Sequence, residues 1–215
     1  MSEVLWSMVW VFNGLIILYF LVLNGVYLST SFFAYGALRR YALRLKTLDL
    51  ERFLRTGGAP PITLISPAFN EEATLEEAVR SLLSLNYPDF EVLVCNDGST
   101  DGTLETLTEA FNLEAVDRVP MGDIPTAQVH KTYRSRRYPN LWVLDKENGG
   151  KADALNAGIN YCRSALFCAM DADTILERDS LLRIVRPFLE DSRTVAAGGI
   201  IRIANGCTIR KGNVE

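Results

Sequence analysis

Apolar runs of four to seven residues alternate along most of this chain with segments whose apolar residues recur at helical spacing. Residues 62–68, 92–95, 141–144 and 166–170 are such runs, and each reads as a buried strand. Helical spacing follows in between, for example at Leu75, Ala78, Val79, Leu82 and Leu83, with Thr74 and Glu77 as a predicted capping box. The same spacing recurs over 155–162 and 181–189, and residues 195–204 read as a further strand. The pattern predicts an α/β fold: an open, mostly parallel sheet with helices on both faces.

Polar residues follow all four apolar runs at the point where the predicted strand ends. The sequences there are PAFNE, NDGSTDGT, LDKENGGK and DAD, at 67–71, 96–103, 144–151 and 171–173. Ligands of open α/β sheets bind at the carboxyl ends of the strands, so these residues are candidates for one site. Asp171 and Asp173 supply the hard oxygen ligands that Mg²⁺ or Mn²⁺ shares with a substrate diphosphate. The alternative is a solvated Asp-x-Asp turn.

The amino-terminal stretch has no charged residue between Glu3 and Arg39. Its core, residues 9–37, is longer than the roughly 20 residues that cross a bilayer, and aromatic residues lie towards both ends. A buried core helix is the alternative. The basic residues after the span predict that the amino terminus is outside and that the following domain is cytoplasmic at the plasma or inner membrane.

These features predict three parts of the chain. Residues 1–38 hold the transmembrane helix, 39–61 form a basic linker, and 62–215 form the domain with the predicted site. The linker is expected either to contact anionic lipid headgroups or to be a plain solvated helix. Within the domain, residues 114–140 carry three prolines and a basic group, which favours a solvated loop, with a flap over the ligand as the alternative.

Charge and histidine content exclude two classes of function. The net charge is −4, which argues against a nucleic-acid partner. The only histidine is His130, and no candidate nucleophile lies near it in the sequence, which argues against covalent hydrolase chemistry.

The four polar motifs, with NGGKADALNAGI at 148–159, resemble those of the family-2 inverting glycosyltransferases with the GT-A fold. The chain is most similar to the membrane polysaccharide synthases of the cellulose, chitin, hyaluronan and poly-N-acetylglucosamine group. The resemblance covers about residues 60–205. It implies a UDP-sugar donor, a divalent Mn or Mg ion, a growing glycan or lipid-linked acceptor, and contact with membrane lipid.

The resemblance also implies roles for individual residues. Asp173 is the implied metal ligand, and Asp171 contacts the ribose or the metal. Asp97 accepts a hydrogen bond from N3–H of a uracil-type base, and Lys151 lies near the nucleotide phosphates. The residues expected to line the base pocket are Pro67, Ala68, Phe69 and Glu71. For Glu71 and Lys151 the alternative is an ordinary helix-end charge.

In this family the general base belongs to a Glu-Asp pair well after the metal motif, and a Gln-x-x-Arg-Trp motif follows. The only Glu-Asp pair here, at 190–191, comes too early, so we expect no catalytic base in this chain and place it beyond Glu215. The chain then corresponds to the donor-binding half of a longer synthase, through truncation, a split gene or a partial sequence, and would not transfer sugar without its missing half. Single-step transfer to a lipid phosphate and a non-catalytic nucleotide-sugar-binding protein are the alternatives.

Overall fold

The computed structural model describes residues 2–47, 57–199, 209–210 and 213–214. The chain divides into two compact units, Met1–Asp49 and Leu50–Glu215. The described residues of the first unit form one helix, α1 (Ser2–Thr47), which continues through the first residues of the predicted basic linker. Residues 48–56 of that linker lie outside the described residues.

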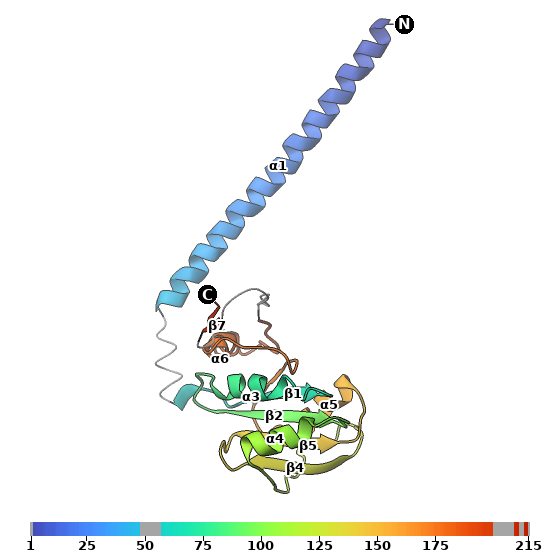
Figure 1. Cartoon of the computed structure of the whole chain (residues 1–215). Helices are drawn as coiled ribbons and strands as arrows, with labels where there is room; N and C mark the ends of the chain where they lie inside the picture. Colours follow the sequence, from blue (N-terminus) through green and yellow to red (C-terminus); the bar gives the residue numbers. More distant parts are fainter. Residues whose placement is uncertain (1, 48–56, 200–208, 211–212, 215) are drawn as a thin grey trace. The chain divides into compact units, whose positions relative to one another are not determined.

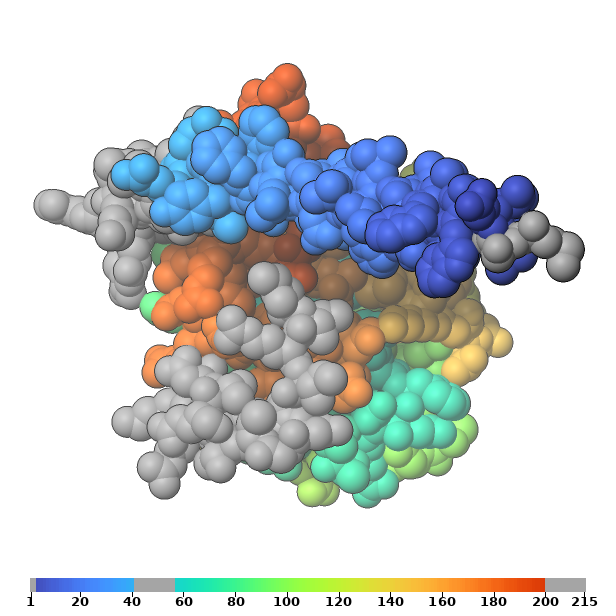
Figure 2. Space-filling view, turned by 90° about the horizontal axis from the view of Figure 1, so that it is seen from above, coloured from blue at the N-terminus to red at the C-terminus, as the bar shows by residue number. Residues whose placement is uncertain are grey.

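Helix α1 is apolar on all sides over most of its length. Glu3–Arg40 has a mean hydropathy of 2.0 and is long and apolar enough to cross a bilayer. Its large side chains are open to their surroundings, and the space-filling view shows them along the blue rod (Figure 2). A helix that is apolar all round is typical of the core of a large protein or of a membrane span.

The second unit is built on a six-stranded sheet with the strand order β3-β4-β5-β2-β1-β6 (Figure 1). Its strands are β1 (Ile62–Ala68), β2 (Phe90–Asp97), β3 (Leu113–Ala115), β4 (Val129–Ser135), β5 (Leu141–Lys146) and β6 (Leu166–Ala169). The neighbours β5, β2, β1 and β6 are all parallel, whereas β4 is antiparallel to both β3 and β5. The predicted mostly parallel sheet is confirmed.

Helices cover both faces of this sheet, as predicted. Strand side chains alternate between the faces, so Leu64 and Val92 enter one apolar core and Ile65 and Leu93 enter the other. Helices α3 (Leu75–Leu83) and α4 (Thr103–Phe111) pack in the first core, and α5 (Lys151–Tyr161) packs in the second. Burial on both faces explains why the strand sequences are continuous apolar runs.

Some of the predictions about local structure are wrong. The predicted loop over 114–140 contains β4, and His130 lies in that strand. Its pairing with β5 and the burial of Thr132 and Ser135 define it, although the strand has few apolar residues. Thr74 precedes α3 as expected, but no capping box forms, because its hydroxyl donates to the Glu71 carboxylate at 2.6 Å.

The carboxyl-terminal part also differs from the prediction. The helix expected over 181–189 is two short helices, α6 (Ser180–Ile184) and α7 (Arg186–Glu190). Pro187, which has no N–H to donate and restricts the residue before it, lies at the start of the second. Residues 195–199 lie outside any strand, and 200–204 lie outside the described residues. Two short strands, β7 (Ile209–Arg210) and β8 (Asn213–Val214), pair antiparallel further on.

Candidate functional site

The carboxyl ends of the parallel strands β5, β2, β1 and β6 meet at one edge of the sheet. A cavity of about 290 Å³ lies there. Its lining residues are Pro67, Ala68, Phe69, Glu71, Asp97, Lys151, Asp171, Ala172 and Asp173. The structure therefore brings all eight predicted site residues together and adds Ala172 to them. They come from β1 and the turn after it, the end of β2, the start of α5 and the turn after β6.

The turns after β1 and β2 hold each other in place, which explains why both motifs are rich in polar residues. Asn70, at a positive φ of 55°, accepts a hydrogen bond from the Thr100 N–H at 2.8 Å. The Asn70 N–H donates to the Ser99 hydroxyl at 3.0 Å. The Glu72 carboxylate accepts the Gly102 N–H at 3.1 Å. These bonds fix the backbone of the turn after β1, to which the cavity residues Phe69 and Glu71 belong.

Asp97 lies at the floor of the cavity and is 3% exposed. Its carboxylate forms an ion pair with Lys146, with 2.5 Å between Oδ1 and Nζ. It also accepts the N–H groups of Gly149 and Gly150, at 3.0 and 2.7 Å. Asp97 is thus a fixed acceptor at the end of β2, and it orders the turn that precedes α5.

Gly98 is required where the turns after β2 and β5 approach each other. Its φ is +67°, a backbone conformation that side chains disfavour. A Cβ atom at this position would lie 2.7 Å from the backbone nitrogen of Asn148. The Asn148 side chain in turn donates to the carbonyl of Asp97 at 2.8 Å. The glycine therefore permits the contact between the two turns beside Asp97.

Asp171 and Asp173 lie on the open side of the cavity, and both are exposed. Lys151, the first residue of α5, forms an ion pair with Asp171 across the cavity. Among the described side chains, no group of three or more His, Cys, Asp and Glu residues gathers to hold a metal. Two carboxylates still fit Mg²⁺ or Mn²⁺, because such ions in nucleotide sites are commonly held by one or two carboxylates together with substrate phosphates.

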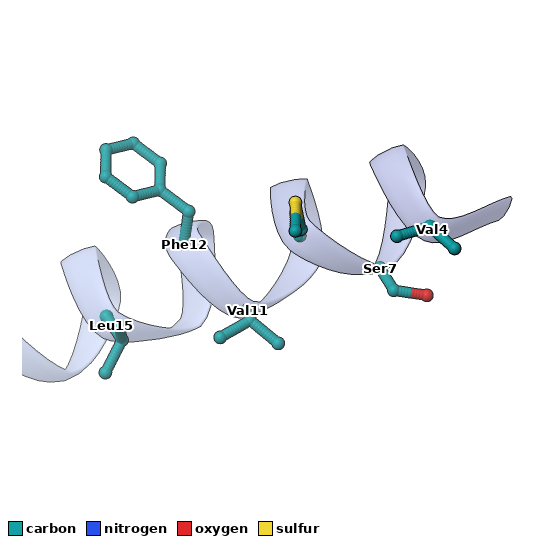
Figure 3. A pocket seen from close by; sticks show the side chains of 6 residues that line it. Val4, Ser7, Val11, Phe12 and Leu15 are labelled. Carbon is teal, nitrogen blue, oxygen red and sulfur yellow. The ribbon is translucent and has the colours of Figure 1, made fainter. Parts of the chain in front are cut away.

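A larger hollow, of about 400 Å³, lies on α1 and is lined by Val4, Ser7, Met8, Val11, Phe12 and Leu15 (Figure 3). These side chains carry no charge, and the hydroxyl of Ser7 donates to the carbonyl of Glu3, so the hollow offers no charged group to a phosphate or a metal.

The interpretation of the sequence missed Lys146, Asp153 and Asn70, which support the cavity. Lys146 and Asp153 form an ion pair with 2.6 Å between Nζ and Oδ1. Because Lys146 donates to it, the Asp153 carboxyl has a pKa below its usual range. Burial acts to lower the pKa of Lys146, but its bonds to Asp153 and Asp97 outweigh burial and raise it. Asn70 and Asp153 lie within the motifs PAFNE and NGGKADALNAGI, and Lys146 ends an apolar run, but no pattern indicated that these residues support the cavity.

Comparison with known proteins yields one family. The model of glycosyl transferase family 2 matches residues 63–119 and 124–213. Among curated proteins, the chain is similar to poly-beta-1,6-N-acetyl-D-glucosamine synthases of Staphylococcus epidermidis and Staphylococcus aureus, each 29% identical over 149 residues. The match covers 69% of this chain and 30% of each relative, so the chain spans well under half the length of these synthases.

Two solved structures have a partly similar fold. One is the mannosyltransferase PcManGT from Pyrobaculum calidifontis in complex with GDP-Man and Mn²⁺, with 25% identity and a TM-score of 0.46, covering 59% of this chain and 32% of that one. The other is a fragment of S. aureus TarS in complex with UDP-GlcNAc, with 22% identity and a TM-score of 0.44, covering 60% and 31%.

Proposed function

The chain belongs to glycosyl transferase family 2, and we propose that its cavity binds the nucleoside diphosphate part of a UDP-sugar together with Mg²⁺ or Mn²⁺. The observation that carries the proposal is the convergence of the eight predicted residues on one cavity at the carboxyl edge of the parallel strands. Each belongs to one of the motifs that resemble those of the family.

The chemistry of the cavity residues supports a division of the ligand between them. Asp97, a buried acceptor, suits an N–H donor of the base, and the half-exposed Phe69 offers a ring for stacking. Lys151 suits a phosphate, since its ammonium stands at the start of α5, where helix N–H groups also favour anions. Asp171 and Asp173 are the proposed metal ligands.

When a sugar is transferred from such a donor, the diphosphate leaves and gains negative charge, which the site must stabilise. Asp171 and Asp173 would hold the divalent cation, which would neutralise the negative charge that develops on the leaving diphosphate. Lys151, which contacts Asp171, adds a second positive charge for the diphosphate, and Asp97 accepts an N–H of the base. We propose inverting transfer to a growing glycan, in keeping with the names of the curated relatives.

The apolar helix α1 supports a membrane location for this activity. We propose that α1 spans the bilayer with the amino terminus outside, that the sheet unit faces the cytoplasm, and that the basic residues from Arg39 onward contact anionic lipid. We also propose the three predicted parts, 1–38, 39–61 and 62–215, as functional divisions of the chain.

Calorimetric titration of UDP into the full chain in detergent tests the proposed site. We expect binding with Mn²⁺ or Mg²⁺ that weakens at least about tenfold with a chelator, a change of 1.4 kcal/mol. Asp173→Ala should abolish this metal dependence. Asp123→Ala is the matched control, because Asp123 is also exposed and does not line the cavity. Equal UDP affinity with metal and with chelator would contradict the proposal.

A further inference from the structure

Lys146 is the most deeply buried charged residue of the second unit among those described. Its side chain is 0% exposed, and it is the residue beside Asp97 in the register of β5 and β2. The ammonium contacts Asp97 Oδ1 at 2.5 Å, Asp153 Oδ1 at 2.6 Å and the carbonyl oxygen of Glu147 at 2.5 Å. All three ammonium hydrogens are therefore used, and Lys146 itself does not line the cavity.

The contacts of Lys146 change what Asp97 can still accept. A carboxylate has about four lone-pair positions, two on each oxygen. Oδ1 of Asp97 receives both the Lys146 ammonium and the Gly149 N–H, so its two positions are filled. Oδ2 receives only the Gly150 N–H. One acceptor position, on Oδ2, is left for a ligand.

We infer that Lys146 is a positioning residue that sets the base selectivity of the site, by occupying Oδ1 of Asp97 and leaving one acceptor for one N–H of the base. The inference rests on the proposed nucleotide site and assigns its selectivity to a residue that does not touch the ligand. Lys146 also forms an ion pair with Asp153 and so lies between the two carboxylates. Asp153 accepts the Ala127 N–H at 2.9 Å, which connects the site to the chain before β4.

One free acceptor position on Asp97 favours a base that offers one N–H donor over a base that offers two. Uracil offers one N–H, at N3, between two carbonyl groups, and one acceptor satisfies it. Guanine offers two adjacent donors, N1–H and the N2 amino group, which together require both oxygens of a carboxylate. With Oδ1 filled, one guanine donor would be buried without a partner, which we expect to weaken GDP relative to UDP by about 10- to 100-fold.

Replacing the lysine tests this selectivity. Lys146→Met keeps an unbranched side chain and removes the ammonium that fixes Oδ1, so the Asp97 carboxylate can turn and offer a second acceptor position to the base. We expect the ratio of the GDP and UDP dissociation constants to fall about tenfold. Lys146→Gln retains a neutral N–H donor for the two carboxylates, which Lys146→Met does not. The Gln variant should therefore give a ratio of GDP and UDP dissociation constants between those of the wild type and Lys146→Met. Both ratios are measured by calorimetry with Mn²⁺ on the full chain in detergent.

Glu91→Gln is the matched control for lost stability. Glu91 pairs with the buried Arg118 at 2.7 Å, and it lies near the opposite end of the strand that carries Asp97. This variant removes a charge from a buried ion pair far from the cavity, so we expect a lower melting temperature and an unchanged GDP-to-UDP ratio.

The outcomes separate this inference from the proposed function. If the wild-type chain binds UDP and both Lys146 variants keep the wild-type ratio, Lys146 has only a structural role and the inference is wrong. The same conclusion follows if Glu91→Gln lowers the ratio as much as Lys146→Met. A wild-type chain that binds neither nucleotide contradicts the proposed function itself, and the inference with it.

Discussion

Replacing Asp97 by alanine should damage both the stability of the sheet unit and nucleotide binding, unlike replacement of any other cavity carboxylate. The change removes the acceptor for three donors, namely Lys146, Gly149 and Gly150. Removing one partner of a buried ion pair typically costs about 3–5 kcal/mol. Here Asp153 and the Glu147 carbonyl still hold the ammonium, and the two glycines are exposed to water, so we expect a loss of about 3 kcal/mol.

The assay is urea unfolding of the full chain in detergent, followed by pulse proteolysis, which reports the folded sheet unit. Asp173→Ala serves as the comparison, because Asp173 is an exposed carboxylate of the same cavity and its loss should change the free energy of unfolding by less than about 0.5 kcal/mol. Calorimetry should show loss of UDP binding in Asp97→Ala and loss of the metal dependence of UDP binding in Asp173→Ala. Equal and small stability losses in the two would refute the role of Asp97 as a buried anchor.

Three further predictions follow from the same contacts. Gly98→Ala should cost roughly 2 kcal/mol, more than Gly150→Ala in urea melts, because both have positive φ but only at Gly98 would a Cβ meet backbone. Lys151→Ala should weaken UDP binding about tenfold in calorimetry and leave the melting temperature unchanged, since its ion pair with Asp171 is exposed. The lowered pKa of Asp153 and the raised pKa of Lys146 should give this pair a constant stability contribution between about pH 4 and pH 10.5, lost below and above. Urea midpoints across pH test this, and Asp153→Asn should reduce the loss on the acid side.

The sign of the pH effect follows from each group separately. Asp153 stabilises the fold when it is ionised, so its contribution is present above its ordinary pKa of 3.8 and is lost as pH falls through the lower value in the folded protein. Lys146 stabilises the fold when it is protonated, so its contribution is present below 10.5 and is lost as pH rises through the higher folded value. A urea midpoint that falls steadily from pH 5 to pH 9 in the wild-type chain, but not in a variant that lacks Lys146, would contradict this assignment.

The parallel core and the cavity residues could be predicted because they follow from simple patterns. Apolar runs such as Val92–Cys95 are continuous because both faces of the sheet are covered, and the polar residue that ends each run necessarily lies at the carboxyl edge. The four runs are neighbours in the sheet, so residues as distant as Pro67 and Asp173 line one cavity.

Strand β4 could not be predicted, because its sequence, VHKTYRS, lacks a clear apolar alternation. It is an antiparallel strand whose position is decided by pairing with β5 and by the side chains of Thr132 and Ser135, which bond to carbonyl oxygens of Val116 and Phe111. Such contacts join residues far apart in the sequence and leave no local pattern.

The burial of Lys146 is a second feature that local sequence does not reveal. A lysine at the end of a strand usually reaches water, and here it is buried because Asp97, 49 residues earlier, and Asp153 surround it. The same holds for Asn70, whose role depends on Thr100 of the next turn. The sequence motifs contain these residues, but they indicated only the roles of the residues that face the cavity.

We propose that a uridine nucleotide binds in the cavity at the carboxyl edge of the sheet. Photolabelling of the full chain with a 5-azido-UDP-sugar and Mn²⁺, followed by peptide mapping, tests this claim most directly. We predict label on peptides that contain residues 67–71 or 96–98, suppressed by excess UDP and by a chelator. Label confined to other peptides, or label on these that persists with chelator and excess UDP, would contradict it.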